Sequence, residues 1–230
     1  MSVLKTLRER IAPELNYLYL VPPAEISGGL DCGWHGHEHA LHAYFVARMF
    51  GAAAELCSGD FAIISRAMPP ITSVGRDSGH GWCSINEVTP IDLGMTFRYF
   101  GEVPQLRAPI IGEGPNGDWR ITYAEDESVL DESIESRNEI VFIEKQVHAH
   151  AASELIENPF LFLPPPRPEE ANHWSAKFGP SVYAKITLHC FDYARGEAKS
   201  VRNRMKPADA VAWIAENYAS PETRILAAAG

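Results

Sequence analysis

The first apolar stretch of the chain has helical spacing. It consists of Val3, Leu4, Leu7, Ile11 and Leu15. Intervals of i, i+3, i+4 and i+7 predict an amphipathic helix that ends near residues 13–16. Residues 17–21 then predict a short extended piece.

A second helical stripe follows Cys32 and ends at Gly51. Its apolar members are Ala40, Leu41, Tyr44, Phe45, Ala47 and Met49. A glycine directly after such a stripe is typical of a helix C-terminus, so we expect a buried helix here. Pro207 predicts the start of a last helix, which contains Val211, Trp213, Ile214 and Tyr218.

Strand patterns occupy the region after the central helix. Residues 54–64 predict one or two short strands, and residues 79–100 predict strands joined by a tight turn near 86–90. Residues 182–191 also alternate as a strand would. A helix followed by strands indicates an α+β fold.

Other segments predict loops and helices. Residues 101–120 are rich in Pro and Gly and predict a long surface loop, whereas 129–156 carry helical periodicity and many charges. The acidic run 125–139 fits a solvated helix face. The proline-rich residues 163–168 predict a stiff connector.

Composition is consistent with one globular domain. A chain of 230 residues with 46% hydrophobic content can bury one sizeable core, which we place at about 17–100, with an elaboration over 101–230. Thirty acidic residues against 20 Lys and Arg give a net charge of −10. This excess disfavours nucleic acid and anionic membranes as partners.

We expect a cytoplasmic protein with reduced thiols. The first 20 residues interleave charged and apolar positions, which is not the pattern of a signal peptide. No apolar run reaches the length of a membrane span. Four cysteines are too few for a disulfide framework in a chain of this length.

Residues 31–51 admit two chemistries, and the first uses a thiol. Cys32 precedes the central helix, and the positive end of a helix dipole lowers the pKa of a cysteine placed there. Such a nucleophile needs a histidine base that a carboxylate orients. His80 and Asp92 are the candidates for these two roles.

The order of these motifs resembles the transglutaminase-like branch of the papain-like superfamily. The resemblance lies in HALHAYFVARMFGAAAELCSGD (residues 39–60), in His80-Gly81-Trp82 and in Ile91-Asp92-Leu93-Gly94, and it covers about 31–95. It implies a central helix packed on an antiparallel sheet, with additional C-terminal helices. It also implies hydrolysis or acyl transfer on a peptide, protein or small amide, or on a thioester, without a cofactor. Trp34 and Trp82 are then candidates for the substrate cleft, besides the core.

The sequence departs from the pattern of that family at the position of the nucleophile. Counting back from Gly51 by the spacing usual in that family places the nucleophile at Gly36, which carries no side chain. Cys32 lies four residues earlier, close to one helical turn, and would face the same side if the helix began one turn sooner. Otherwise the chain is a non-catalytic binding protein with this fold. Cys57 and Cys83 lie in apolar strand patterns, where a thiol is normally a small buried hydrophobe.

The second chemistry uses a metal. His35, Glu38 and His39 form H-x-x-E-H, in which two histidines share a helix face and the glutamate activates a zinc-bound water. This alternative is a zinc-dependent hydrolase. Its third protein ligand would come from elsewhere, and the candidates are Glu144, His148 and His150. The last two would share a face only in a strand, and the pattern there predicts a helix.

Overall fold

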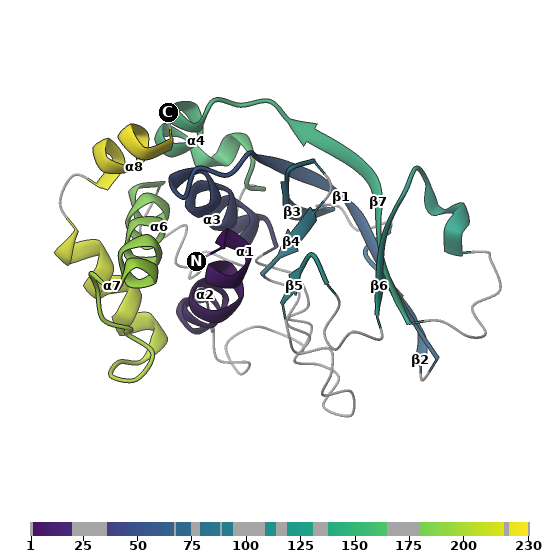
Figure 1. The fold of residues 1–230 in the computed structure, drawn as a ribbon, viewed down its shortest axis with the longest axis horizontal. Helices are drawn as coiled ribbons and strands as arrows, with labels where there is room; N and C mark the ends of the chain where they lie inside the picture. Colours follow the sequence, from purple (N-terminus) through teal and green to yellow (C-terminus); the bar gives the residue numbers. More distant parts are fainter. Residues whose placement is uncertain are drawn as a thin grey trace.

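The computed structural model combines a curled sheet with a layer of helices (Figure 1). It describes residues 2–19, 36–66, 68–74, 79–87, 89–93, 109–113, 119–130, 138–164, 180–218 and 221–229. The architecture is mixed α and β, as the alternation of patterns predicted.

Within the described ranges, seven strands form a single sheet. They are β1 (Ala54–Ser65), β2 (Met68–Thr72), β3 (His80–Ile85), β4 (Thr89–Asp92), β5 (Ile110–Ile111), β6 (Arg120–Ala124) and β7 (Glu139–His148). Their order is β5-β4-β3-β1-β7-β6, and β2 pairs with β1. All pairs are antiparallel except β6 with β7, which is parallel. The sheet is therefore mixed, whereas the resemblance implied an antiparallel one.

The helices cover one face of this sheet. They are α1 (Val3–Thr6), α2 (Ala12–Leu18), α3 (Gly36–Met49), α4 (Ala152–Glu157), α6 (Pro180–Arg195), α7 (Pro207–Asn217) and α8 (Pro221–Ala229). Helix α3 packs on β1, β3 and β4 and also contacts α6 and α8. Short 3₁₀ turns at Glu127–Leu130 and Pro159–Leu161 and a π-helical turn at Leu7–Ile11 complete the described elements.

The opening helix is longer than its sequence pattern predicted. A π-helical turn, Leu7–Ile11, joins α1 to α2, and the amide of Ala12 donates to the carbonyl of Leu7. This widened turn ends two residues before Pro13, which has no N–H for the regular helical ladder. The helix continues to Leu18 and Tyr19 follows as a turn residue (φ −91°, ψ 11°), so the extended piece predicted from residue 17 is wrong for its first three residues. Residues 20 and 21 lie outside the described part.

Two further sequence-based predictions are wrong. Residues 139–148, predicted as helix, form strand β7, because the apolar run that begins at Ile140 is buried between β1 and β6. Residues 182–191, predicted as strand, belong to helix α6. This helix is packed by α3, α7 and α8, so burial on several sides hides its helical period.

The central helix and the tight turn agree with their predictions. Gly51 has φ +77° and ends α3, with the Ala52 amide bonded to the Ala47 carbonyl at 2.9 Å. Asn86 and Glu87 both have positive φ between β3 and β4. The predicted loop 101–120 contains strand β5 in its described part.

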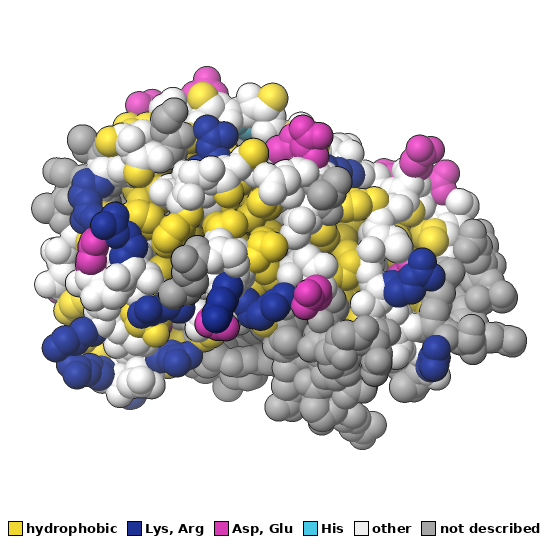
Figure 2. Space-filling view, viewed as in Figure 1, with side chains coloured by type: hydrophobic (Ala, Val, Ile, Leu, Met, Phe, Trp, Pro, Cys, Tyr) yellow, Lys and Arg dark blue, Asp and Glu magenta, His cyan; other side chains and the backbone are white. Residues whose placement is uncertain are grey.

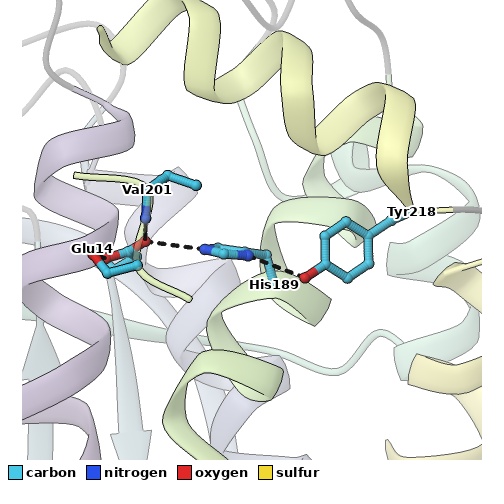
Figure 3. Close-up of polar contacts among 5 residues, drawn as sticks. Glu14, His189, Val201 and Tyr218 are labelled. Atoms are coloured by element: carbon cyan, nitrogen blue, oxygen red, sulfur yellow. Dashed lines mark hydrogen bonds and ion pairs between the residues drawn. The ribbon is translucent and has the colours of Figure 1, made fainter. Parts of the chain in front are cut away.

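A buried polar network fastens the helices to one another (Figure 3). Glu14 of α2 accepts hydrogen bonds from His189 Nε2 (3.0 Å), Ser200 Oγ (2.7 Å) and the Val201 amide (2.9 Å). The Nδ1 atom of His189 bonds the Tyr218 hydroxyl at 3.1 Å. The carboxylate of α2 therefore joins α6 and residues 200–201, and Tyr218 is added to the network through His189.

Charges are unevenly spread over the surface. On the face in Figure 2, Lys and Arg side chains gather over the helical half, and apolar side chains form a band across the middle. Among the helices of the described ranges, none has the length and apolar character to cross a membrane.

Candidate functional site

His80 and Asp92 lie on neighbouring strands and form a buried pair. His80 is the first residue of β3, and Asp92 is the last residue of β4. The Nε2 atom of His80 is hydrogen-bonded to Oδ2 of Asp92, and the two residues are 2% and 1% exposed. The strand pairing thus brings together the two residues proposed as base and orienting acid. Their chemical roles stay predictions.

The opposite edge of the His80 ring lies against the first described residue of α3. A Cβ atom added to Gly36 would lie 2.7 Å from Cε1 and 2.8 Å from Nδ1 of His80. It would also approach the Gly81 carbonyl oxygen to 3.3 Å. Because Asp92 holds Nε2, the nitrogen turned toward the helix is Nδ1. Residue 36, the position that the resemblance implies for the nucleophile, therefore lies beside the candidate base and is a glycine.

The other predicted members of the thiol site are divided between two places. Cys32 and Trp34 lie outside the described residues. Trp82 is fully buried, and its ring lies 4.7 Å from that of Phe142 and 6.4 Å from that of His80. Trp82 therefore packs beside the His80 ring inside the protein.

The three described cysteines are buried free thiols. Burial raises the pKa of Cys57 to about 11 and raises those of Cys83 and Cys190 further above their usual range. A thiol with a raised pKa holds little thiolate at neutral pH and is a poor nucleophile. Cys57 and Cys83 therefore behave as the apolar residues that their strand patterns predicted.

His37 packs directly behind the strand that carries His80. A Cβ atom on Gly81 would lie 2.8 Å from the Cα of His37 and from its ring. Burial, with a smaller contribution from nearby His80, lowers the pKa of His37 to about 4. This imidazole is neutral at pH 7 and fills the space between α3 and β3. In the sequence, only the glycine at position 81 pointed to this contact, because a residue without a side chain allows close packing.

The remaining histidines of α3 face the other helices. The Tyr19 hydroxyl is hydrogen-bonded to His42 Nε2, and His42 Nδ1 lies 2.6 Å from Thr187 Oγ1. Burial lowers the pKa of His42 to about 3. The ring of His39 lies 4.8 Å from that of Tyr19. Sequence inspection missed Tyr19 and Thr187, because their partners are distant in the chain.

The predicted metal ligands are only partly described. His35 lies outside the described residues, whereas Glu38 and His39 are buried on α3. Among the residues with described positions, no group of three or more His, Cys, Asp or Glu side chains is arranged to hold a metal ion. The candidate third ligands Glu144 and His148 are in β7.

His148 and His150 share one side of the chain after all. Their rings lie 6.3 Å apart and nearly parallel, because the segment is extended and not helical as predicted. His148 Nε2 bonds Ser58 Oγ at 2.6 Å. These two imidazoles therefore form a separate cluster near the end of β7.

Comparison with protein-family models, curated proteins and solved structures finds no match to this chain. Inferences about function therefore depend on the arrangement of its own residues.

Proposed function

We propose that this protein is a thiol-dependent hydrolase or acyltransferase that acts on an amide, peptide or thioester carbonyl. The observation that supports this proposal is the position of His80 between Asp92 and the start of α3. A histidine with one nitrogen on a carboxylate and the other facing a helix N-terminus has the geometry of a general base for a nucleophile at that terminus. The nucleophile in this proposal is Cys32.

The buried pair favours one tautomer of His80. A neutral ring that donates its Nε2 proton to Asp92 keeps a lone pair on Nδ1. That nitrogen can take the thiol proton while Cys32 attacks the substrate carbonyl. The Asp92 carboxylate then stabilises the imidazolium that forms.

The proposed reaction has two steps, acylation of Cys32 and then release of the acyl group from its sulfur. In the first, sulfur bonds to the carbonyl carbon, and the amine or thiol leaving group departs with the proton held on His80 Nδ1. In the second, water or an acceptor amine gives a proton to Nδ1 and attacks the thioester, and the released Cys32 sulfur regains that proton. Backbone N–H groups near the start of α3 would stabilise the oxyanion in both steps.

Gly36 favours a second candidate, which is a non-catalytic binding protein with the same architecture. Cys32 lies four residues before Gly36, and four residues of a helix rise about 6 Å along its axis. Side chains on a helix also tilt toward its N-terminus, away from a ring level with position 36. A regular helix through residue 32 would thus hold the thiol too far from His80, so catalysis requires a different backbone path there.

The pH dependence of Cys32 alkylation by iodoacetamide separates these candidates. We expect labelling well below the pKa of a free thiol, about 8.5, and at least tenfold slower labelling at pH 6 in His80→Ala. Asp92→Asn should slow labelling in the same direction. His150→Gln is the matched control, because it changes an imidazole outside the His80–Asp92 pair.

Labelling of Cys32 at the rate of an ordinary thiol, unchanged in His80→Ala, would reject the enzyme and favour the binding protein. Zinc content should be measured on the same preparations. One zinc per chain that protects Cys32 or is lost in His39→Ala would instead favour the metal-dependent hydrolase.

A further inference from the structure

His148 and His150 present two imidazoles to one cavity near the end of β7. Their ring centres lie 6.3 Å apart, and the ring planes differ by 26°. Residues at i and i+2 of an extended chain point to the same side, which is why the two rings are neighbours. The cavity has a volume of about 630 Å³, and Tyr44 of α3 and Leu226 of α8 also line it. Both imidazoles are half-buried, so a solute in the cavity can reach them.

A hydrogen bond fixes the orientation of the His148 ring. Its Nε2 lies 2.6 Å from Ser58 Oγ, and the Phe162 ring packs edge-on at 5.0 Å. In a neutral ring that donates its Nε2 proton to Ser58, Nδ1 keeps a lone pair. Within the described part of the chain, neither this Nδ1 atom nor the ring of His150 has a hydrogen-bond partner. A histidine that is held at one nitrogen and open at the other has the arrangement common to metal ligands.

The charged residues of the cavity do not select its ligand. Arg48 and Glu55 line it with opposite signs, and Lys145, which is outside the lining, lies 3.6 Å from the Glu55 carboxylate. The distinguishing groups of the cavity are therefore its two imidazoles. Imidazole nitrogen binds Zn²⁺, Cu²⁺ and Ni²⁺, whereas Mg²⁺ and Ca²⁺ prefer oxygen ligands.

The two histidines lie apart from the candidate catalytic pair. His148 pairs with Leu56 of β1, whereas His80 pairs with Gly59, three residues further along the same strand. Three residues of a strand span about 10 Å. A ligand held by His148 and His150 is therefore not held by the residues of the proposed reaction.

We propose that His148 Nδ1 and the imidazole of His150 together bind a divalent transition-metal ion such as Zn²⁺. Among the described residues, no third His, Cys, Asp or Glu side chain joins them, so water completes the coordination and leaves positions open toward the cavity. Ser58 is a positioning residue, because it holds the His148 ring without touching the metal ion. This inference goes beyond the proposed reaction and does not depend on it.

Zinc is titrated into the full chain after treatment with a chelator, and the imidazole signals of His148 and His150 are followed by NMR. We expect saturable shifts of both rings, with the metal on Nδ1 of His148 and the proton kept on its Nε2. Mg²⁺ at the same concentration should shift neither ring. His39→Ala should leave these shifts unchanged, which separates this site from the zinc alternative at His35, Glu38 and His39.

Three variants test the geometry of the site. Ser58→Ala should weaken zinc binding roughly 10- to 100-fold, because the His148 ring loses its support. His150→Ala removes a ligand from a half-buried position and should weaken binding further. Ala149→His combined with His150→Ala keeps two imidazoles but turns the second to the opposite side of the extended chain, so it should not restore binding.

Unshifted imidazole signals at millimolar zinc would overturn the proposal. Equal zinc affinity in the unchanged protein and in His150→Ala would also overturn it, since that is the behaviour of two independent histidines. Full binding in the double variant at 149 and 150 would show that the two rings do not act as one chelate. An unchanged affinity in Ser58→Ala would overturn the positioning role of Ser58.

Discussion

The His80 imidazole lies edge-on against the Cα of Gly36, so closely that a Cβ at position 36 would approach Nδ1 to 2.8 Å. Asp92 holds the opposite edge of the ring, which leaves it little freedom to move aside. The glycine that removes a nucleophile from this position therefore also makes room for the base. This relationship links the question of catalysis to the packing of α3 on β3.

Gly36→Ala is expected to destabilise the protein by about 1–3 kcal/mol, although alanine is the better helix former. The added methyl must displace His80 or shift α3. The free energy of unfolding in urea measures this cost. In the double variant Gly36→Ala with His80→Ala the clash disappears, so the cost of the first substitution should fall to near zero or reverse. Additive effects of the two substitutions would contradict direct contact.

Stability should decline as the pH falls below about 6.5. The pKa of His37 in the folded protein is about 4, below the 6.5 of the unfolded chain, because the ring is buried. Between these values the unfolded state binds more protons, so stability is retained above 6.5 and lost toward pH 4. For His37 alone the loss is on the order of 3 kcal/mol, and His42 acts in the same direction.

Urea unfolding from pH 4 to 8 measures this dependence. His37→Gln should have a shallower decline than the unchanged protein. An NMR titration in which the His37 ring protonates near pH 6.5 would contradict the expected burial effect.

Glu14→Gln is expected to destabilise the protein by roughly 1–3 kcal/mol, since it weakens three buried hydrogen bonds to a charged acceptor (Figure 3). Burial alone would raise the pKa of Glu14, but the hydrogen bonds from His189, Ser200 and Val201 outweigh it and lower the pKa below 4.5. This contribution is present above pH 4.5 and is lost as the pH falls through the lower folded value.

Chemical denaturation at pH 7 and pH 3 tests the Glu14 network. The penalty of Glu14→Gln should be larger at pH 7 than at pH 3. Glu216→Gln, an exposed carboxylate on α7, serves as the control and should change stability little at either pH. A pH-independent penalty would show that the charge of Glu14 is not what stabilises the network.

The three described cysteines should resist alkylation in the native protein. The thiol pKa of Cys57 is about 11, and burial raises those of Cys83 and Cys190 as well. Mass spectrometry after iodoacetamide treatment at pH 8 should find these residues unlabelled, and labelling in urea should modify all of them. Native labelling of Cys83 at a rate similar to that of Cys32 would contradict the described packing of β3.

Local patterns identified the central helix, the β3–β4 turn and the residues of the His80–Asp92 pair. These features depend on short-range rules: apolar spacing and a terminal glycine define a helix, and residues that tolerate positive φ define a tight turn. The role of Cys32 as nucleophile and the zinc hypothesis stay predictions. The central position of β7 was not recoverable from its own residues, because a strand buried between two others lacks the alternation that marks a half-buried strand.

The sequence by itself determined which groups are available: a histidine and an aspartate in neighbouring strand patterns, a cysteine before a helix, and a glycine at position 36. Only the tertiary structure decided which of them touch. The ring of His80 meets Gly36 because α3 packs on β3, and Glu14 meets His189 because two helices 175 residues apart in the chain lie side by side. Contacts of this kind come from long-range packing, whose energy depends on the whole core. The sequence pattern of one segment does not show which distant residue it will contact.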